Sequence, residues 1–165
     1  CRMVSLALAS LTFAAPPVPG DVWPAYRGDG TSRSAATDLP LTWSPTENVG
    51  WRVELPGYGQ SSPVVWKGKV YVTAVEGPKK ETLHVACVDL ASGKTAWAKS
   101  FASTQPGPNN PMTSRAAPTP VADAAGVVCF FESGDLIALS PAGEVRWKRS
   151  LSEEYGELKN NHGIA

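Results

Sequence analysis

Short apolar runs rich in β-branched and aromatic residues recur along the chain, and glycine, proline, asparagine or serine separates each run from the next. No stretch after residue 20 keeps its apolar positions at the helical period. Short strands at a spacing of about ten residues predict an all-β protein, which is a sandwich, a barrel or a propeller. The predicted strands are residues 62–66, 70–75, 83–88, 95–98, 120–122, 127–131, 135–139 and 144–147.

One motif returns at a nearly fixed interval, and this favours a propeller over the other two architectures. Trp51–Leu55, Trp97–Phe101 and Trp147–Leu151 each place a basic residue within two positions of the tryptophan and an apolar residue four positions after it. The intervals are 46 and 50 residues. A second series repeats at an offset of 57 residues: 62–65 matches 119–122, and 70–72 matches 127–129. A period of this length, with about four short strands in each unit, is typical of propeller blades.

The number of residues limits how many blades the chain can form. At ~45 residues a blade, a ring of four needs ~180 residues, which is more than the chain provides after residue 20. We therefore expect an incomplete ring of about three blades, closed by further residues or by another chain. The expected domain is 21–165, with repeats near 21–55, 56–101 and 116–151 and the start of another at 156–165.

The first twenty residues have the order of a secretory signal peptide. Arg2 precedes the apolar stretch Val4–Ala15, and the breaker run Pro16–Gly20 follows it. Twelve residues are fewer than the ~20 of a membrane-spanning helix, and a buried amphipathic helix is the other alternative. We expect export to the periplasm or the cell surface. A disulfide between Cys87 and Cys129 is permitted there, but both thiols lie in apolar runs, which favours two inert core cysteines.

Composition and motifs exclude several function classes. The 15 basic and 15 acidic residues give a formal net charge of zero, so the clustered basic excess of nucleic-acid binders is absent from the sequence. Cysteine and histidine show no CxxC or HExxH spacing, and serine shows no GxSxG elbow. No residue is assigned a catalytic, cofactor-binding or metal-binding role.

The repeats carry a second pattern that resembles the tryptophan docking motif of the PQQ-like (quinoprotein) β-propellers, in particular the secreted BamB-like members. The motif runs Ala-x-Asp, then glycine four residues on, then tryptophan after four more. Here Cys87 stands in the alanine place before Asp89, Gly93 and Trp97. The next copy has Ser140 for the aspartate and is one residue shorter, ending in Gly143 and Trp147.

This resemblance implies four-stranded antiparallel blades and a structural role for the motif. Asp89, Gly93 and Gly143 are expected in hairpin turns, where glycine supplies a positive φ. Trp51, Trp97 and Trp147 are expected to pack at the seams between blades. A sugar-stacking surface aromatic is the functional alternative, but repetition at matching positions favours packing.

Two functions are compatible with the resemblance. The first is a non-catalytic scaffold of the cell envelope, which binds other envelope proteins or a ligand and holds no cofactor. The alternative is a quinoprotein dehydrogenase that uses PQQ and Ca²⁺, whose site would be completed by blades outside this sequence. Such an enzyme needs hard oxygen ligands for the metal and a carboxylate base for the substrate hydroxyl. Neither group of residues stands out in the sequence.

Overall fold

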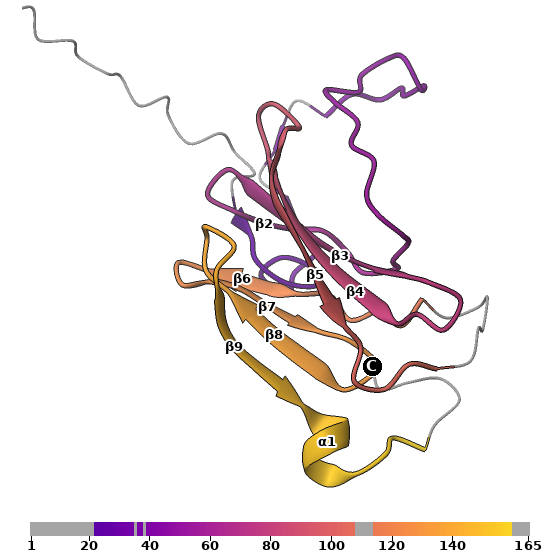
Figure 1. Cartoon of the computed structure of the whole chain (residues 1–165). Helices are drawn as coiled ribbons and strands as arrows, with labels where there is room; N and C mark the ends of the chain where they lie inside the picture. Colours follow the sequence, from indigo (N-terminus) through magenta and orange to yellow (C-terminus); the bar gives the residue numbers. More distant parts are fainter. Residues whose placement is uncertain (1–21, 35, 38, 108–113, 160–165) are drawn as a thin grey trace, which may run out of the picture.

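The computed structural model describes residues 22–34, 36–37, 39–107 and 114–159. It is all-β apart from one short helix, and its strands form two antiparallel sheets that pack against each other (Figure 1). The predicted signal peptide lies outside the described residues, so the expectation of export stays a prediction. The one helix in the described part, of five residues, is too short to cross a membrane.

The first sheet has five strands in the order β1-β2-β3-β4-β5. Four of them are consecutive antiparallel neighbours, as expected of a blade, and the fifth, β1, pairs with the edge of β2. The strands are β1 (Val22–Trp23), β2 (Val64–Trp66), β3 (Lys69–Glu76), β4 (Thr82–Asp89) and β5 (Thr95–Ala102).

The second sheet has four strands in the order β6-β7-β8-β9. They are β6 (Val121–Asp123), β7 (Gly126–Phe130), β8 (Asp135–Leu139) and β9 (Val145–Ser150), and the helix α1 (Leu151–Tyr155) follows directly. The side chain of Ser150 accepts a hydrogen bond from the amide of Glu153, which caps the helix. The fold class expected from the sequence is confirmed, because both sheets are antiparallel meanders of short strands.

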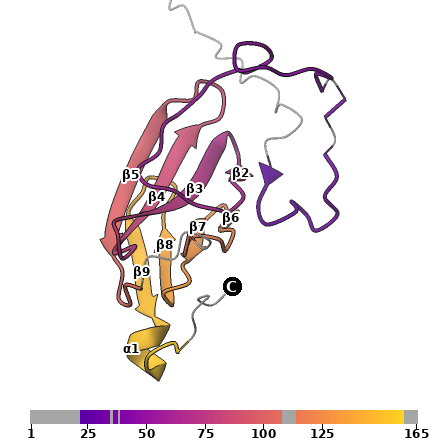
Figure 2. The same cartoon turned by 90° about the vertical axis from the view of Figure 1, so that its right-hand side faces the viewer.

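The described residues between 22 and 58 form no sheet of their own, although the first repeat was expected near 21–55. Their contribution is β1, an isolated bridge between Ser44 and Glu47, and another between Tyr58 and Val75. Figure 2 shows the chain before β2 running across the strands of the first sheet. The described residues therefore contain two sheets, and the first predicted repeat serves as a cover for one of them.

The two sheets use the same register. In the first sheet a cross-strand row joins Val64, Tyr71, Cys87 and Trp97. In the second sheet the matching row joins Val121, Val128, Ala138 and Trp147. Each sheet also has a register shift directly after the third member of its row, between Cys87 and Val88 or between Ala138 and Leu139. The sequence repeat is thus a repeat of strand pairing, residue by residue.

The hydrophobic core lies between the sheets. It combines Val64, Tyr71, Val85 and Cys87 from the first sheet with residues of the second that point back towards them. Those of the second sheet are Ala122, Val127, Cys129, Ile137 and Leu139. Both described cysteines are free and fully buried in this core, as the sequence favoured.

Candidate interaction site

The first tryptophan seam joins the segment before β2 to the first sheet. The indole N–H of Trp51 donates a hydrogen bond to the carbonyl oxygen of Leu90 at 2.8 Å. Its ring lies on Gly93, where an added Cβ would come within 2.6 Å of the indole Cγ. Gly93 has a φ of 68°, so glycine both permits the hairpin turn and leaves room for the ring.

The second seam repeats this arrangement between the two sheets. Trp97 on β5 donates its indole N–H to the carbonyl oxygen of Pro141 at 3.1 Å, in the β8–β9 hairpin. A Cβ at Gly143, whose φ is 83°, would come within 2.7 Å of the Trp97 ring. The ring of Tyr71 lies 5.9 Å from that of Trp97 at an interplanar angle of 47°. Each tryptophan therefore docks on the glycine hairpin of the sheet that follows it.

The hairpins themselves are held by the polar residue in the aspartate place of each motif, which is Asp89 in the first sheet and Ser140 in the second. One carboxylate oxygen of Asp89 accepts hydrogen bonds from the amide and the hydroxyl of Ser92, at 2.8 and 2.6 Å. These two hydrogen bonds lower the pKa of Asp89. In the shorter hairpin the hydroxyl oxygen of Ser140 accepts from the amide of Glu144 at 3.1 Å. The Asp-to-Ser difference between the repeats thus keeps a side-chain acceptor at the turn.

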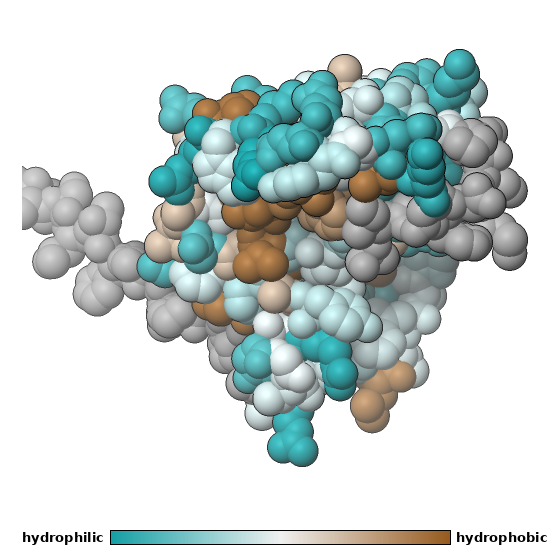
Figure 3. All heavy atoms as spheres, turned by 90° about the horizontal axis from the view of Figure 1, so that it is seen from below, coloured by the Kyte–Doolittle hydropathy of each residue, from teal (hydrophilic) through white to brown (hydrophobic). Residues whose placement is uncertain are grey.

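Trp147 occupies the same register position as Trp97 but has different surroundings. It is 43% exposed, and no described residue accepts a hydrogen bond from its indole N–H. Val121 and Val128 of the same row are also exposed. Figure 3, which looks at the molecule from below, shows hydrophobic residues in the middle of that side with hydrophilic residues around them. We call the surface formed by Val121, Val128, Ala138 and Trp147 the open face.

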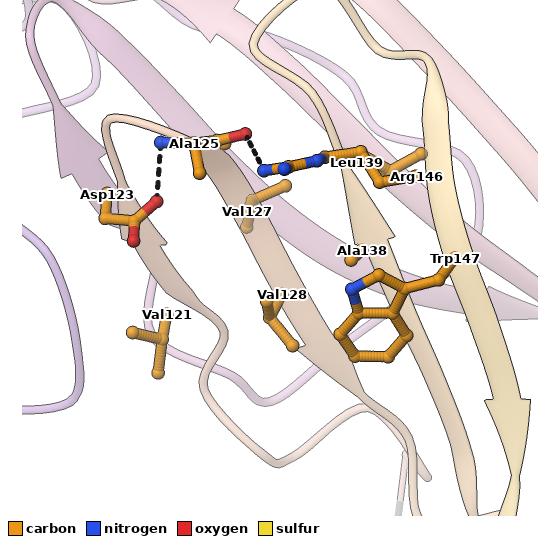
Figure 4. Close-up of a pocket in the computed structure, with 10 residues that line it drawn as sticks. Val121, Asp123, Ala125, Val127, Val128, Ala138, Leu139, Arg146 and Trp147 are labelled. Carbon is orange, nitrogen blue, oxygen red and sulfur yellow. Dashed lines mark hydrogen bonds between the residues drawn. The ribbon is translucent and has the colours of Figure 1, made fainter.

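The open face contains a shallow groove of about 120 Å³. Figure 4 shows the indole of Trp147 lying beside Ala138 and Val128, with Val121 further along the same side of the sheet. A polar end closes the groove: the amide of Ala125 donates to Asp123 at 2.7 Å, and Arg146 donates to the carbonyl of Ala125 at 3.1 Å (Figure 4). The groove thus offers an apolar floor, a free indole N–H and a fixed polar edge.

The two buried carboxylates of the described residues, Asp135 and Glu132, lie in and directly after the β7–β8 connection. Asp135 is buried, and its carboxylate accepts hydrogen bonds from Thr104 and Ser133. Glu132 is also buried, and burial raises the pKa of its carboxyl, an effect that Arg115 and Lys80 partly offset. In the described residues no three His, Cys, Asp or Glu side chains gather as metal ligands would.

The sequence singled out the tryptophans and glycines of the seams but missed the valines that make the open face. A signal for them was present, because the offset of 57 residues pairs Val121 with Val64 and Val128 with Tyr71. The exposure of the face depends on what packs against it, and alternation along a strand does not report that.

Comparison with known proteins bears on the family of the chain. A search among curated proteins finds no match for the chain. A family model described as "Outer membrane protein assembly factor BamB" matches residues 14–160, which is most of the chain. This match confirms the resemblance seen in the repeats, and the chain belongs to the BamB-like family of PQQ-like β-propeller proteins.

Proposed function

We propose that the protein is a non-catalytic binding scaffold of the cell envelope that interacts with other proteins through its open face. The observation that carries the proposal is the half-exposed Trp147 within a row of apolar side chains. Exposed apolar patches rimmed by polar groups mark interaction surfaces, and tryptophan is enriched among residues that dominate binding energy. The family description, which names an outer membrane assembly factor, supports a location in the envelope.

The partner that fits the open face is another β-sheet. Trp97, at the matching position, is covered by a sheet that supplies Gly143 below the ring and the Pro141 carbonyl for the indole N–H. A partner for Trp147 therefore needs a hairpin with glycine at a positive φ and a free carbonyl next to it. Further residues of the protein or another chain could supply such a hairpin, and of these two we propose another chain, an envelope protein.

The alternative is a PQQ- and Ca²⁺-dependent dehydrogenase whose site would be completed by blades outside this sequence, and the donors of the described residues favour the scaffold over it. Ca²⁺ prefers six to eight oxygen ligands, several of them carboxylates. The two buried carboxylates are Asp135, whose oxygens accept hydrogen bonds from Thr104 and Ser133, and Glu132, which lies near the cations Arg115 and Lys80. This arrangement does not fit a calcium site, and we derive no reaction step through the quinone.

Two experiments test the proposal. A photo-crosslinking amino acid at position 147, in cells that export the protein, should give a discrete product, and mass spectrometry should place the cross-linked peptide in a β-hairpin of another envelope protein. The matched control carries the crosslinker at Tyr155, which is 76% exposed and lies outside the open face. Calorimetric titration of the purified protein with PQQ and CaCl₂ should show no binding. Cross-links confined to the same chain, or Ca²⁺-dependent PQQ binding below micromolar concentration, would overturn the scaffold proposal.

A further inference from the structure

The strands β2 and β6 lie next to each other, and each contains only three residues. β6 ends the second sheet, and β2 would end the first sheet if the two residues of β1 did not pair with it. Edge strands present unpaired amide and carbonyl groups and so act as templates for an added strand. These two edges therefore form a surface that an extended peptide can bind through its main chain.

A segment of the chain itself occupies this surface. Val22 and Trp23 pair with Trp66 and Val65 on β2, and the carbonyl oxygen of Pro24 accepts a hydrogen bond from the amide of Ala122 on β6 at 2.8 Å. The next residues after β1 thus cross from one sheet to the other. Three consecutive residues thus make main-chain contacts to two different sheets. From these contacts, the surface accepts an extended segment. The third residue of that segment donates no amide hydrogen bond, so proline suits this position.

The segment turns back on itself, and this turn fixes the position of the Trp23 ring. The amide of Gly28 donates to the carbonyl of Ala25 at 2.9 Å, and Gly28 has a φ of 70°. A Cβ at Gly28 would come within 2.8 Å of the Trp23 ring, so the ring lies directly on this glycine. The shape of residues 22–28 is therefore set locally, by Trp23 and Gly28, as well as by the sheet edges.

Few contacts bind this segment to the two sheets. Pairing covers two residues of β1, and Val22 at its start is 49% exposed. Each main-chain hydrogen bond is only weakly stabilising on balance, because it replaces a hydrogen bond to water, so a segment held by a few of them can exchange with a competitor. Its attachment to the chain compensates, because a tethered segment acts at an effective concentration in the millimolar range.

We infer that the paired edges of β2 and β6 are a strand-addition site, filled in cis by residues 22–28, that takes an extended aromatic-proline segment of a partner protein. This inference rests on the proposed scaffold function and names the chemistry of a second partner contact, separate from the open face. The partner segment would pair with β2 over two residues, place its aromatic ring where Trp23 lies, and give a carbonyl to the amide of Ala122.

The test uses the chain's own segment as the probe. A fluorescein-labelled peptide of residues 22–30 is titrated into the full chain and into the full chain with Trp23→Ala, and anisotropy is followed. We expect saturable binding to the variant and binding about tenfold weaker, or weaker still, to the unchanged chain, because there the tethered segment competes. The matched control peptide carries alanine in place of its tryptophan and should not bind.

Hydrogen exchange on the unchanged full chain gives a second readout that does not depend on a substitution. Saturating peptide should leave the amides of residues 64–66 and 121–123 protected while those of Val22 and Trp23 lose protection, since only exchange of one strand for another gives that pattern. No saturable binding to the Trp23→Ala chain, or equal binding of the control peptide, would overturn the inference. Failure of the crosslink at position 147 would count against the open face alone, because that face is made of side chains, while the strand-addition site uses the main chain along the edges of β2 and β6.

Discussion

The two sheets carry matching cross-strand rows of side chains, one covered by the neighbouring sheet and the other exposed. In the first sheet the row Val64, Tyr71, Cys87 and Trp97 is covered by the second sheet, and its indole N–H has a partner. In the second sheet the matching row ends at Trp147, which is 43% exposed. The same register therefore gives a buried row in one sheet and an exposed row in the other. What decides between them is whether a glycine hairpin lies opposite the ring.

Removing the two tryptophans in turn is the strongest test of this difference. Trp97→Ala should lower the free energy of unfolding by about 3 kcal/mol, because the ring packs in the seam and its loss leaves a cavity. Trp147→Ala should cost less than about 1 kcal/mol, since its ring loses few contacts. Urea unfolding followed by circular dichroism measures both. If the two losses were equal, the open face would be covered in solution.

The glycine under the ring gives a smaller effect of the same origin. Gly143→Ala should cost about 2 to 3 kcal/mol, of which about 1 kcal/mol is the strain of a positive φ and the rest is the clash with Trp97. Gly30 is the control, because its φ is also positive, at 92°, but an added Cβ meets no atom within 4 Å. Gly30→Ala should cost only about 1 kcal/mol in the same urea experiment. Equal costs would mean that the ring does not rest on Gly143.

A third difference between the sheets gives the smallest effect and depends on pH. The bridge between Tyr58 and Val75 at the first sheet has its counterpart at the second in the hydrogen bond from the amide of Glu132 to the carbonyl of Arg115. Burial leaves one carboxylate oxygen of Glu132 without a hydrogen-bond partner and raises the pKa of this group. A raised pKa in the folded state means that ionisation disfavours folding, so stability falls as pH rises through that pKa.

Glu132→Gln should therefore raise the melting temperature at pH 7 to 8, and the gain should shrink as the pH is lowered towards 4, where the native carboxyl is protonated. Glu144→Gln, at an exposed position in the β8–β9 hairpin, is the control and should show no such trend. Melting temperatures at four or five pH values measure both variants. A gain for Glu132→Gln that grew at low pH would show that the carboxylate stabilises the fold.

Much of the fold could be predicted from local pattern. Strand positions followed from β-branched runs between glycine and proline, and the seams followed from the interval between tryptophans, because both signals lie in short stretches of sequence. The strand β1 could not be predicted, since its two residues precede a proline and pair with a strand some forty residues away. The helix α1 was also missed, although Ser150 and Glu153 have the spacing of a helix cap.

The open face shows a second limit of prediction from the sequence. Trp97 and Trp147 have nearly the same local sequence and the same cross-strand neighbour position, yet one is a packing residue and the other is a candidate contact. The two tryptophans differ only in the segment that packs against the ring, and the residues next to either tryptophan in the sequence do not specify that segment. The strand-pairing register, and not the residue composition, identified Val121 and Val128 as the counterparts of Val64 and Tyr71.

The alkylation rates of the two buried thiols, Cys87 and Cys129, can report how fast the core opens. Burial raises the pKa of Cys129 to about 12 and also raises that of Cys87, so neither thiol forms the reactive thiolate while the sheets stay together. Each thiol reports on one sheet, because Cys87 lies on β4 and Cys129 on β7. Alkylation of the native protein, resolved by peptide mass, would therefore time the separation of the two sheets without any added label.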